Sequence, residues 1–147
     1  MSADDALAPG THLLRVLKDK PVHVDPVTRL PTPAAFEPSS ADLAHAPVRV
    51  SVWDADHVPL ARAIELRGGG ELMGFVLTVA DVVAIANELA ASHLRAVKDP
   101  DGARNCDPDE ARWHYGVEGL EGDAWRGRRA DRQHALRALA RACQAAT

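Results

Sequence analysis

Two carboxylates and an imidazole lie close together in the sequence, at Asp54, Asp56 and His57. Carboxylate oxygens bind hard divalent cations and imidazole titrates near neutral pH, so this trio could hold a metal ion or supply a general base. Aspartates also accept hydrogen bonds from the free backbone donors at the start of a helix. Because a proline-led apolar run begins at Pro59, we expect Asp56 to start a helix and predict no metal site.

A second set of candidate residues is dispersed along the chain. Arg15, Ser51 and Glu118 fall on or directly after segments that we expect to be strands, with Glu121 as an alternative to Glu118 and His114 nearby. None of them stands in a local motif that pairs a nucleophile with a base. Their order along the chain is therefore the main feature that could point to catalysis.

This order of arginine, serine and glutamate is similar to that of the Arg-Ser-Glu class of ADP-ribosyltransferases. In that family the arginine holds the phosphates of the cofactor, and the glutamate stabilises the transferring ribose. The resemblance implies an NAD-using enzyme with Arg15, Ser51 and Glu118 as catalytic residues. The chain departs from the family in two places, because no Ser-Thr-Ser follows Val50 and residues 118–121 read Glu-Gly-Leu-Glu instead of Glu-x-Glu.

Arginines are concentrated near the C-terminus. From Asp123 onward the chain has six arginines against two aspartates, although its net charge is -4. Such an asymmetry marks either a surface for nucleic acid or an acidic partner, or a tail that docks on its own acidic body. We prefer the docked tail and expect no specific nucleic-acid ligand, since the acidic remainder repels phosphate. The candidate binding residues of the whole chain are Asp54, His57, His114, Arg129 and Arg132.

Length and composition are those of one soluble globular domain. The chain has 147 residues, of which 46% are hydrophobic and 26% charged. The longest apolar stretch is interrupted by polar residues, so we expect no membrane association. The acidic N-terminus is unlike a secretory signal, and two widely separated cysteines are typical of reduced thiols. We therefore expect a cytoplasmic protein without a cofactor.

Hydrophobic spacing predicts alternating strands and helices. Period-two alternation indicates strands near 48–52, 71–77 and 112–117, and short apolar segments are interpreted as strands near 12–17 and 94–97. Helices are expected at about 58–67, from 78 onward and at 128–145. Thr78 and Asp81 form a capping-box pattern, and Leu136, Leu139 and Cys143 form the apolar seam of the last helix. Five prolines between 18 and 40 predict a wrapped loop over 21–40.

The resulting fold class is α+β, a small single-domain sandwich of about four to five strands with three helices. Residues 1–10 are expected to be disordered, and residues 11–147 to form the domain. The preferred function is a protein-binding or accessory module without catalysis, which contacts a protein partner through the proline-rich segment 21–38 and the C-terminal helix. The alternative is an ADP-ribosyltransferase-like or other nucleotide-using enzyme with a dispersed Arg/Ser/Glu site. The sequence does not indicate an oligomeric state.

Overall fold

A single antiparallel sheet of six strands, in the order β4-β5-β2-β1-β3-β6, runs through the molecule. The computed structural model describes residues 7–146. The strands are β1 (His12–Lys18), β2 (Arg49–Asp54), β3 (Leu72–Thr78), β4 (Arg95–Lys98), β5 (His114–Glu118) and β6 (Gln144–Ala145). The expectation of an α+β fold is confirmed.

The helices are more numerous than the sequence suggested. They are α1 (Ser40–Leu43), α2 (Leu60–Leu66), α3 (Val79–Glu88), α4 (Pro108–Ala111) and α5 (Arg129–Ala142), with 3-10 turns η2 (Pro33–Phe36), η3 (Pro100–Gly102) and η4 (Gly122–Trp125). The expected count of four to five strands and three helices is thus too low. The two missed helices have only four residues each, too few to show helical periodicity, and β6 has only two residues.

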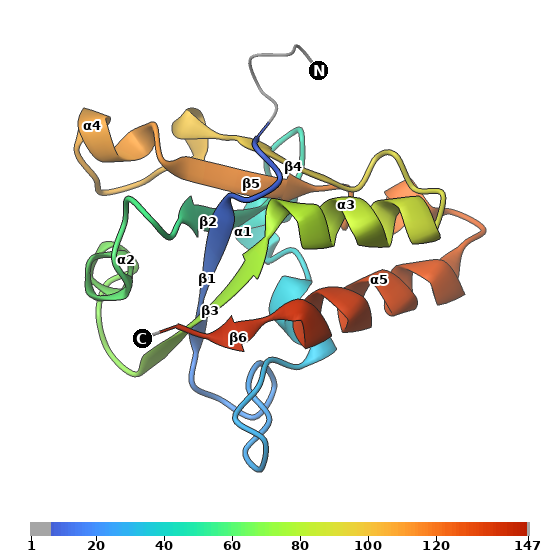
Figure 1. Cartoon of the computed structure of the whole chain (residues 1–147), viewed down its shortest axis with the longest axis horizontal. Coiled ribbons are helices and arrows are strands. Elements are labelled where there is room, and N and C mark those ends of the chain that lie inside the picture. The colour runs from blue at the N-terminus through green and yellow to red at the C-terminus, as the bar shows by residue number, and fades with distance from the viewer. Residues whose placement is uncertain (1–6, 147) are drawn as a thin grey trace.

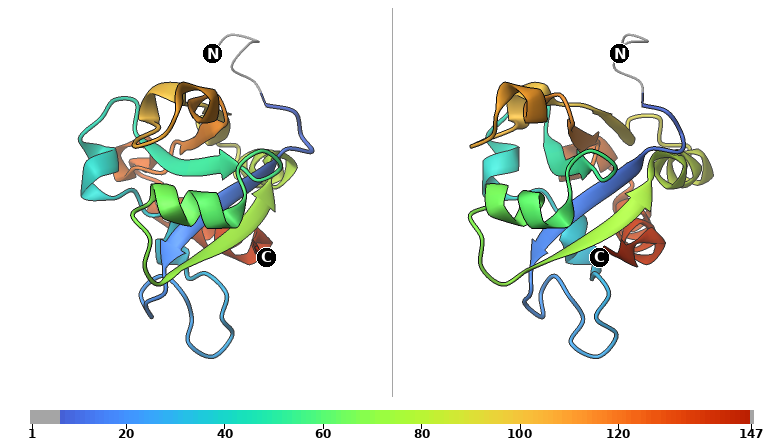
Figure 2. Two further views of the ribbon diagram at one scale, coloured as in Figure 1. Left: turned by 90° about the vertical axis from the view of Figure 1, so that its left-hand side faces the viewer. Right: turned by 60° about the vertical axis from the view of Figure 1, so that its left-hand side comes forward.

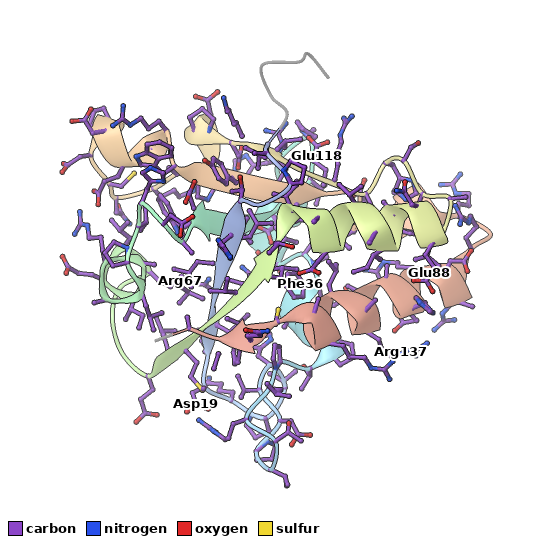
Figure 3. All side chains as sticks on the ribbon, viewed as in Figure 1. Asp19, Phe36, Arg67, Glu88, Glu118 and Arg137 are labelled. Atoms are coloured by element: carbon purple, nitrogen blue, oxygen red, sulfur yellow. The ribbon has the colours of Figure 1, made fainter. Side chains whose placement is uncertain are left out.

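The main hydrophobic core lies between one face of the sheet and the helices α3 and α5, which run side by side (Figure 1). Alternate strand residues such as Leu13, Val52, Phe75 and Val117 point into it and are almost fully buried. Phe36 of η2 reaches the same core from the proline-rich segment, and Figure 3 shows it behind the two helices. This segment is therefore anchored to the body at its C-terminal end.

The opposite face of the sheet carries a smaller core under α2. Leu14 and Val16 of β1 and Trp53 of β2 are buried there against Ala63 and Leu66. Figure 2 shows α2 on the side of the sheet away from α3 and α5. Beyond α2, polar side chains of β2 and β5 occupy this face, and they form the candidate site described below.

Capping residues were predicted from the sequence at the starts of two helices, α2 and α3. Thr78 and Asp81 form a capping box at α3. The Thr78 amide donates to the Asp81 carboxylate at 2.9 Å, and the Asp81 amide donates to the Thr78 hydroxyl at 3.1 Å, so this prediction is confirmed. The expectation for Asp56 is wrong, because α2 begins at Leu60 behind Pro59 and has no side-chain cap. The turn before α2 is instead closed by Asp54, whose Oδ1 accepts a hydrogen bond of 2.9 Å from the Asp56 amide.

The proline-rich segment forms the loop that extends from the lower end of the molecule in Figure 1. An isolated bridge pairs Val24 with Pro31, and the hydroxyl of Thr32 donates to the carbonyl of Val22 at 2.5 Å. The tip between them is exposed, with Val27 at 88%. The predicted loop over 21–40 thus also includes the turn η2 and the start of α1.

The last helix packs as its spacing predicts. Leu136, Leu139 and Cys143 are buried, while Arg137 and Arg141 are exposed, and Figure 3 shows Arg137 directed away from the body. The helix ends at Ala142 instead of 145, because Cys143 is extended and the next two residues pair with β3. Within residues 7–146, no helix has the length and apolar character needed to cross a membrane.

The expected disorder of residues 1–10 concerns mostly residues that lie outside the described part, namely 1–6. From residue 7 onward the chain is tied to the domain. The carbonyls of Ala8 and Pro9 accept hydrogen bonds of 3.0 and 2.9 Å from Thr11 and Ala80. The side chain of Leu7 packs against the main core.

Candidate functional site

A cleft with two lobes lies over the polar face of β2 and β5. The lobes have volumes of about 310 and 290 Å³ and meet at shared lining residues. The shared residues are Ala41, Asp42, Ser51, Gly102, Arg104 and His114. The helix α1 and the loop around η3 therefore form the walls, and the two strands form the floor.

Ser51 and His114 form a close pair on this floor. The Oγ of Ser51 lies 2.7 Å from Nε2 of His114. Ser51 is opposite Gly116 in the β2–β5 register, and His114 is opposite Trp53, so both polar side chains project from the same face of neighbouring strands. Ser51 lines both lobes, whereas His114 is 2% exposed.

The other side of the His114 ring is held by Asp99. Nδ1 of His114 lies 2.7 Å from the backbone carbonyl of Asp99 and 3.5 Å from its carboxylate Oδ2. Because a carbonyl can only accept, Nδ1 carries the hydrogen, and Nε2 is left to accept a hydrogen bond from Ser51. Burial lowers the pKa of His114 below its usual value, so the ring is neutral at physiological pH. Trp53 packs edge-on against it, with ring centroids 4.7 Å apart.

Arg15 reaches the cleft through a gap in the sheet. Strands β1 and β2 pair at only two positions, Leu13 with Asp54 and Leu14 with Trp53, and then diverge. The guanidinium of Arg15 bridges the gap, with Nη1 donating to the Ser51 carbonyl at 3.0 Å and Nε donating to the Ala35 carbonyl at 3.1 Å. It thus replaces backbone donors that the diverging strand no longer supplies.

Arg15 is a buried positive charge. Its side chain lines the second lobe but is only 8% exposed, and among residues 7–146 it forms no ion pair with a carboxylate. Burial, and after it the repulsion from Arg67, lower the pKa of Arg15 to about 10. The group therefore stays charged at neutral pH at the expense of desolvation.

Further positive charges surround the second lobe. Arg67 and Arg104 are exposed and line it together with Arg15, whereas Asp42 is its one carboxylate within the described chain. Arg67 donates to the Val16 carbonyl at 3.2 Å. Burial, followed by the charges of Arg15 and Arg67, also lowers the pKa of His23. The second lobe is therefore a region of positive potential.

The first lobe has a different electrostatic character, because Arg49, one of its two arginines, is neutralised. Arg49 donates to Asp99 at 2.9 Å and to Glu118 at 2.8 Å, and Arg95 donates to the other oxygen of Glu118 at 2.7 Å. Burial alone would raise the pKa of Glu118, but the hydrogen bonds from Arg95 and Arg49 hold the pKa below its usual value. Glu118 is thus an ionised, fully engaged side chain.

The structure brings together only part of the dispersed Arg-Ser-Glu set. Arg15 and Ser51 are in contact and line the second lobe, but Glu118 does not line either lobe and is held behind Arg49. In Figure 3 it lies at β5, well away from Arg67. Glu121 lies beyond the end of β5, with its buried Oε2 lacking a hydrogen-bond partner in the described chain.

The corner after β2 is a structural assembly outside this cleft. Asp54 is 5% exposed and accepts a hydrogen bond of 2.9 Å from the Tyr115 hydroxyl. His57 stacks on Trp113 with ring centroids 3.5 Å apart, and its Nδ1 lies 3.1 Å from Asp54. No group of three or more potential metal ligands is found among residues 7–146.

The two arginines proposed as binding residues differ from one another. Arg132 is bound to Glu37 and to the carbonyl of Leu120, so it fastens α5 to the body. Arg129 is the exposed first residue of α5. Neither lines the cleft.

The sequence indicated Ser51, His114 and Arg15 as candidate site residues, but it did not predict that His114 pairs with Ser51. It missed Asp99, Arg67 and Arg104. Asp99 begins an Asp-Pro-Asp-Gly run that reads as a turn, and nothing in this run shows that the turn folds over β5. The Ser51–His114 contact spans 63 residues, and only the order of the strands makes it visible.

Comparison of this chain with protein-family models, with curated proteins and with solved structures finds no match.

Proposed function

We propose that this chain binds a small anionic molecule in the second lobe of the cleft. The observation that carries the proposal is the state of Arg15, which is buried and charged but has no carboxylate partner in the described chain. Burying an unpaired charge costs several kcal/mol, and an anion at the guanidinium would offset that cost. A carboxylate or phosphate group suits this site, because both accept the forked donors of arginine.

The surroundings of Arg15 also favour an anion. Arg67 and Arg104 supply two further donors at the mouth, and Ser39 and Ser51 supply polar side chains to the lining. A lobe of about 290 Å³ is at the lower end of the range for small-molecule sites. We therefore expect a ligand of the size of phosphate or a short carboxylic acid.

Isothermal titration calorimetry at low salt tests this proposal. Inorganic phosphate, succinate and glutarate are titrated into the protein, with succinamide as an uncharged control. We expect saturable binding of at least one anion and none of succinamide. Arg67→Gln and Arg104→Gln should each weaken binding by about tenfold or more, because each removes a charge-assisted hydrogen bond worth roughly 1.5–3 kcal/mol.

The matched control is Arg137→Gln, which removes an exposed arginine from α5 on the other side of the sheet. Its affinity for the anion should equal that of the wild type. Absence of saturable binding for every anion, or equal affinity in Arg67→Gln, Arg104→Gln and Arg137→Gln, would contradict the proposal. Arg67 and Arg104 are preferred to Arg15 for this test because they are exposed and their replacement should leave the fold intact.

NAD is titrated in the same series, because the resemblance to ADP-ribosyltransferases implies NAD as cofactor. The geometry supports this alternative less well, since Glu118 is engaged by Arg49 and Arg95 and does not line the cleft. A saturable NAD titration that Arg15→Gln and Glu118→Gln both abolish, while circular dichroism stays unchanged, would favour the enzyme alternative over simple anion binding.

A second function is proposed for the tip of the proline-rich loop, namely docking to a protein partner. Val22, Val27 and Leu30 are exposed to 58%, 88% and 45%, and these are three of the five exposed large hydrophobic residues within 7–146. Their concentration on one extended loop supports a recognition role, since a proline-rich chain loses little entropy on docking.

Peptide selection from a displayed library tests this second function. Peptides selected on the wild type should lose binding to Val27→Ser and Leu30→Ser. They should retain binding to Val83→Ser, which removes a comparably exposed valine from α3. Selected peptides that bind all three variants equally would place the surface elsewhere and contradict the proposal.

A further inference from the structure

The floor of the cleft holds a serine whose hydroxyl is already hydrogen-bonded to a base. Ser51 Oγ lies 2.7 Å from Nε2 of His114, within the range at which a proton passes directly between the two atoms. The Asp99 carbonyl at 2.7 Å fixes the hydrogen of the ring on Nδ1, so Nε2 is the free acceptor. The tautomer is therefore the one that a general base needs.

The base is fixed in position and less accessible than the serine. His114 is enclosed by Trp53, by Asp99 and by the serine, and it is 2% exposed. Asp99 is itself held by Arg49 at 2.9 Å. Ser51 and His114 both line the two lobes of the cleft, but Ser51 is only half-buried. A molecule in the cleft would thus contact the serine hydroxyl more readily than the imidazole.

Positive charge lines the second lobe together with Ser51. Arg15 donates to the backbone carbonyl of Ser51, so its guanidinium sits beside the nucleophile. Arg104 lines both lobes, and although its Nη2 lies 3.0 Å from Nε2 of His45, its other N–H groups can donate to an oxygen that becomes negative during attack. A neutral serine–histidine pair beside arginines is the arrangement that acyl transfer from an anionic substrate requires.

From these contacts we propose that Ser51 and His114 are the nucleophile and general base for hydrolysis of small carboxylic esters that carry an anionic group. This inference rests on the proposed function, because the arginines of the second lobe would hold the anionic group while the ester carbonyl lies at Ser51. Asp99 lines the first lobe and acts through the imidazole that its carbonyl holds, so it is a positioning residue.

The reaction balances with water as the only co-reactant. His114 Nε2 takes the proton of Ser51 while Oγ forms a bond to the acyl carbon, and the tetrahedral adduct expels the alcohol oxygen, which takes that proton from Nε2. Water then gives a proton to Nε2 and attacks the acyl carbon. The bond from the acyl carbon to Oγ breaks, Oγ recovers the proton, and the free acid leaves.

The test compares two chromogenic esters of similar length. The p-nitrophenyl monoester of succinic acid carries an anionic acyl group, and p-nitrophenyl butyrate is its neutral counterpart. We expect kcat/KM for the anionic ester to exceed that for the neutral ester by about tenfold or more. Ser51→Ala should lower kcat/KM for the anionic ester by at least about a hundredfold. The matched control is Ser92→Ala, which removes an exposed serine outside the cleft and should leave the rate unchanged.

Two further measurements separate this inference from the proposed function. A reactive fluorophosphonate should label Ser51 alone, as read by mass spectrometry of the peptides, and Ser51→Ala should still bind succinate in the calorimeter. Anion binding without labelling or Ser51-dependent turnover would overturn the inference and leave the proposed function standing. Ser51-dependent turnover without anion binding, or without preference for the anionic ester, would overturn the proposed function and the assigned substrate class. Equal rates in the wild type and Ser51→Ala would overturn the catalytic role of Ser51.

Discussion

Arg132 binds both carboxylate oxygens of Glu37, although the two residues lie 95 positions apart in the sequence. The two distances are 3.1 and 2.7 Å. Glu37 directly follows η2, and Arg132 belongs to α5, so the pair joins the proline-rich segment to the basic C-terminal helix. Both segments are expected from the sequence to contact partners, and here they contact one another. Part of the positive charge of the tail is thereby used within the molecule.

Removing this bidentate pair should weaken the fold moderately. Arg132→Ala is expected to lower the free energy of unfolding by about 1–2 kcal/mol, because the arginine also donates to the Leu120 carbonyl at 2.9 Å. Glu37→Ala should cost less, about 0.2–1 kcal/mol, since its partly exposed ion pair is screened by solvent. Urea unfolding measures both. The control is Arg129→Ala, which should change stability by less than about 0.5 kcal/mol; equal losses in the two arginine variants would refute the assignment.

Leu139 is fully buried between α5 and the sheet, so its truncation should be costly. We expect Leu139→Ala to lower the free energy of unfolding by about 2–5 kcal/mol through lost burial and the cavity that remains. Arg137→Ala, on the exposed side of the same helix, is the control and should stay within about 0.5 kcal/mol of the wild type. A melting temperature of Leu139→Ala equal to that of the control would show that the seam of α5 is misassigned.

Position 102, in the wall of the cleft, has no room for a side chain larger than that of glycine. A Cβ atom at this position would overlap the carboxylate of Asp99 and lie 3.1 Å from the His114 ring. Gly102→Ala should therefore displace Asp99, lower stability by about 1–3 kcal/mol and weaken anion binding. Gly122→Ala is the matched control, because nothing lies within 4 Å of a Cβ there. Calorimetry and urea unfolding of both variants check the prediction, and unchanged values for Gly102→Ala would contradict it.

His114 should make stability decrease as the pH falls below about 7, which unfolding measured from pH 5 to 7.5 can follow. Burial holds its folded-state pKa below the usual 6.5, against the opposing influence of the Asp99 carbonyl and the carboxylates of Asp99 and Asp42. As the pH falls through about 6.5, the unfolded chain takes up a proton that the folded chain does not, so the free energy of unfolding decreases. Above about pH 7.5 the contribution is constant.

Urea unfolding of the wild type and His114→Gln across this pH range isolates the effect. The stability of the wild type relative to His114→Gln should decrease toward acid by at most about 1.4 kcal/mol per pH unit. Titration of His23, whose pKa is also lowered, is common to both proteins and largely cancels. A difference that is flat from pH 5 to 7.5, or that grows toward acid, would show that the His114 pKa is not lowered.

The strands could be predicted because their burial alternates. Val50 and Val52 are fully buried and flank Ser51, and this period of two is visible in the sequence alone. The seam of α5 was predictable for the same reason, as was the capping box of α3, since both rest on residues less than two turns apart. Asp56 was misjudged because proline itself can begin a helix without a side-chain cap.

The candidate site could not be predicted as a whole, because long-range pairing builds it. Ser51 meets His114 only because β2 and β5 are neighbours, and Arg15 meets Ser51 only because β1 and β2 separate after two residue pairs. Strand order and the length of a pairing depend on loop closure and packing across the entire chain, and no local pattern encodes them. The chemistry of single residues was visible, whereas their partners were not.

The short pairing between β1 and β2 divides the sheet into two parts that are joined by few backbone contacts. One leaf consists of β4, β5 and β2 and carries Ser51 and His114, and the other consists of β1, β3 and β6 and carries Arg15. Seven residue pairs join β1 to β3, but only two join β1 to β2, so we expect bending to concentrate where the leaves meet. An anion shared by Arg15 and Ser51 would tie the leaves together. We therefore expect ligand binding in the cleft to make the whole sheet more rigid. Slower amide hydrogen exchange in both leaves would report this change.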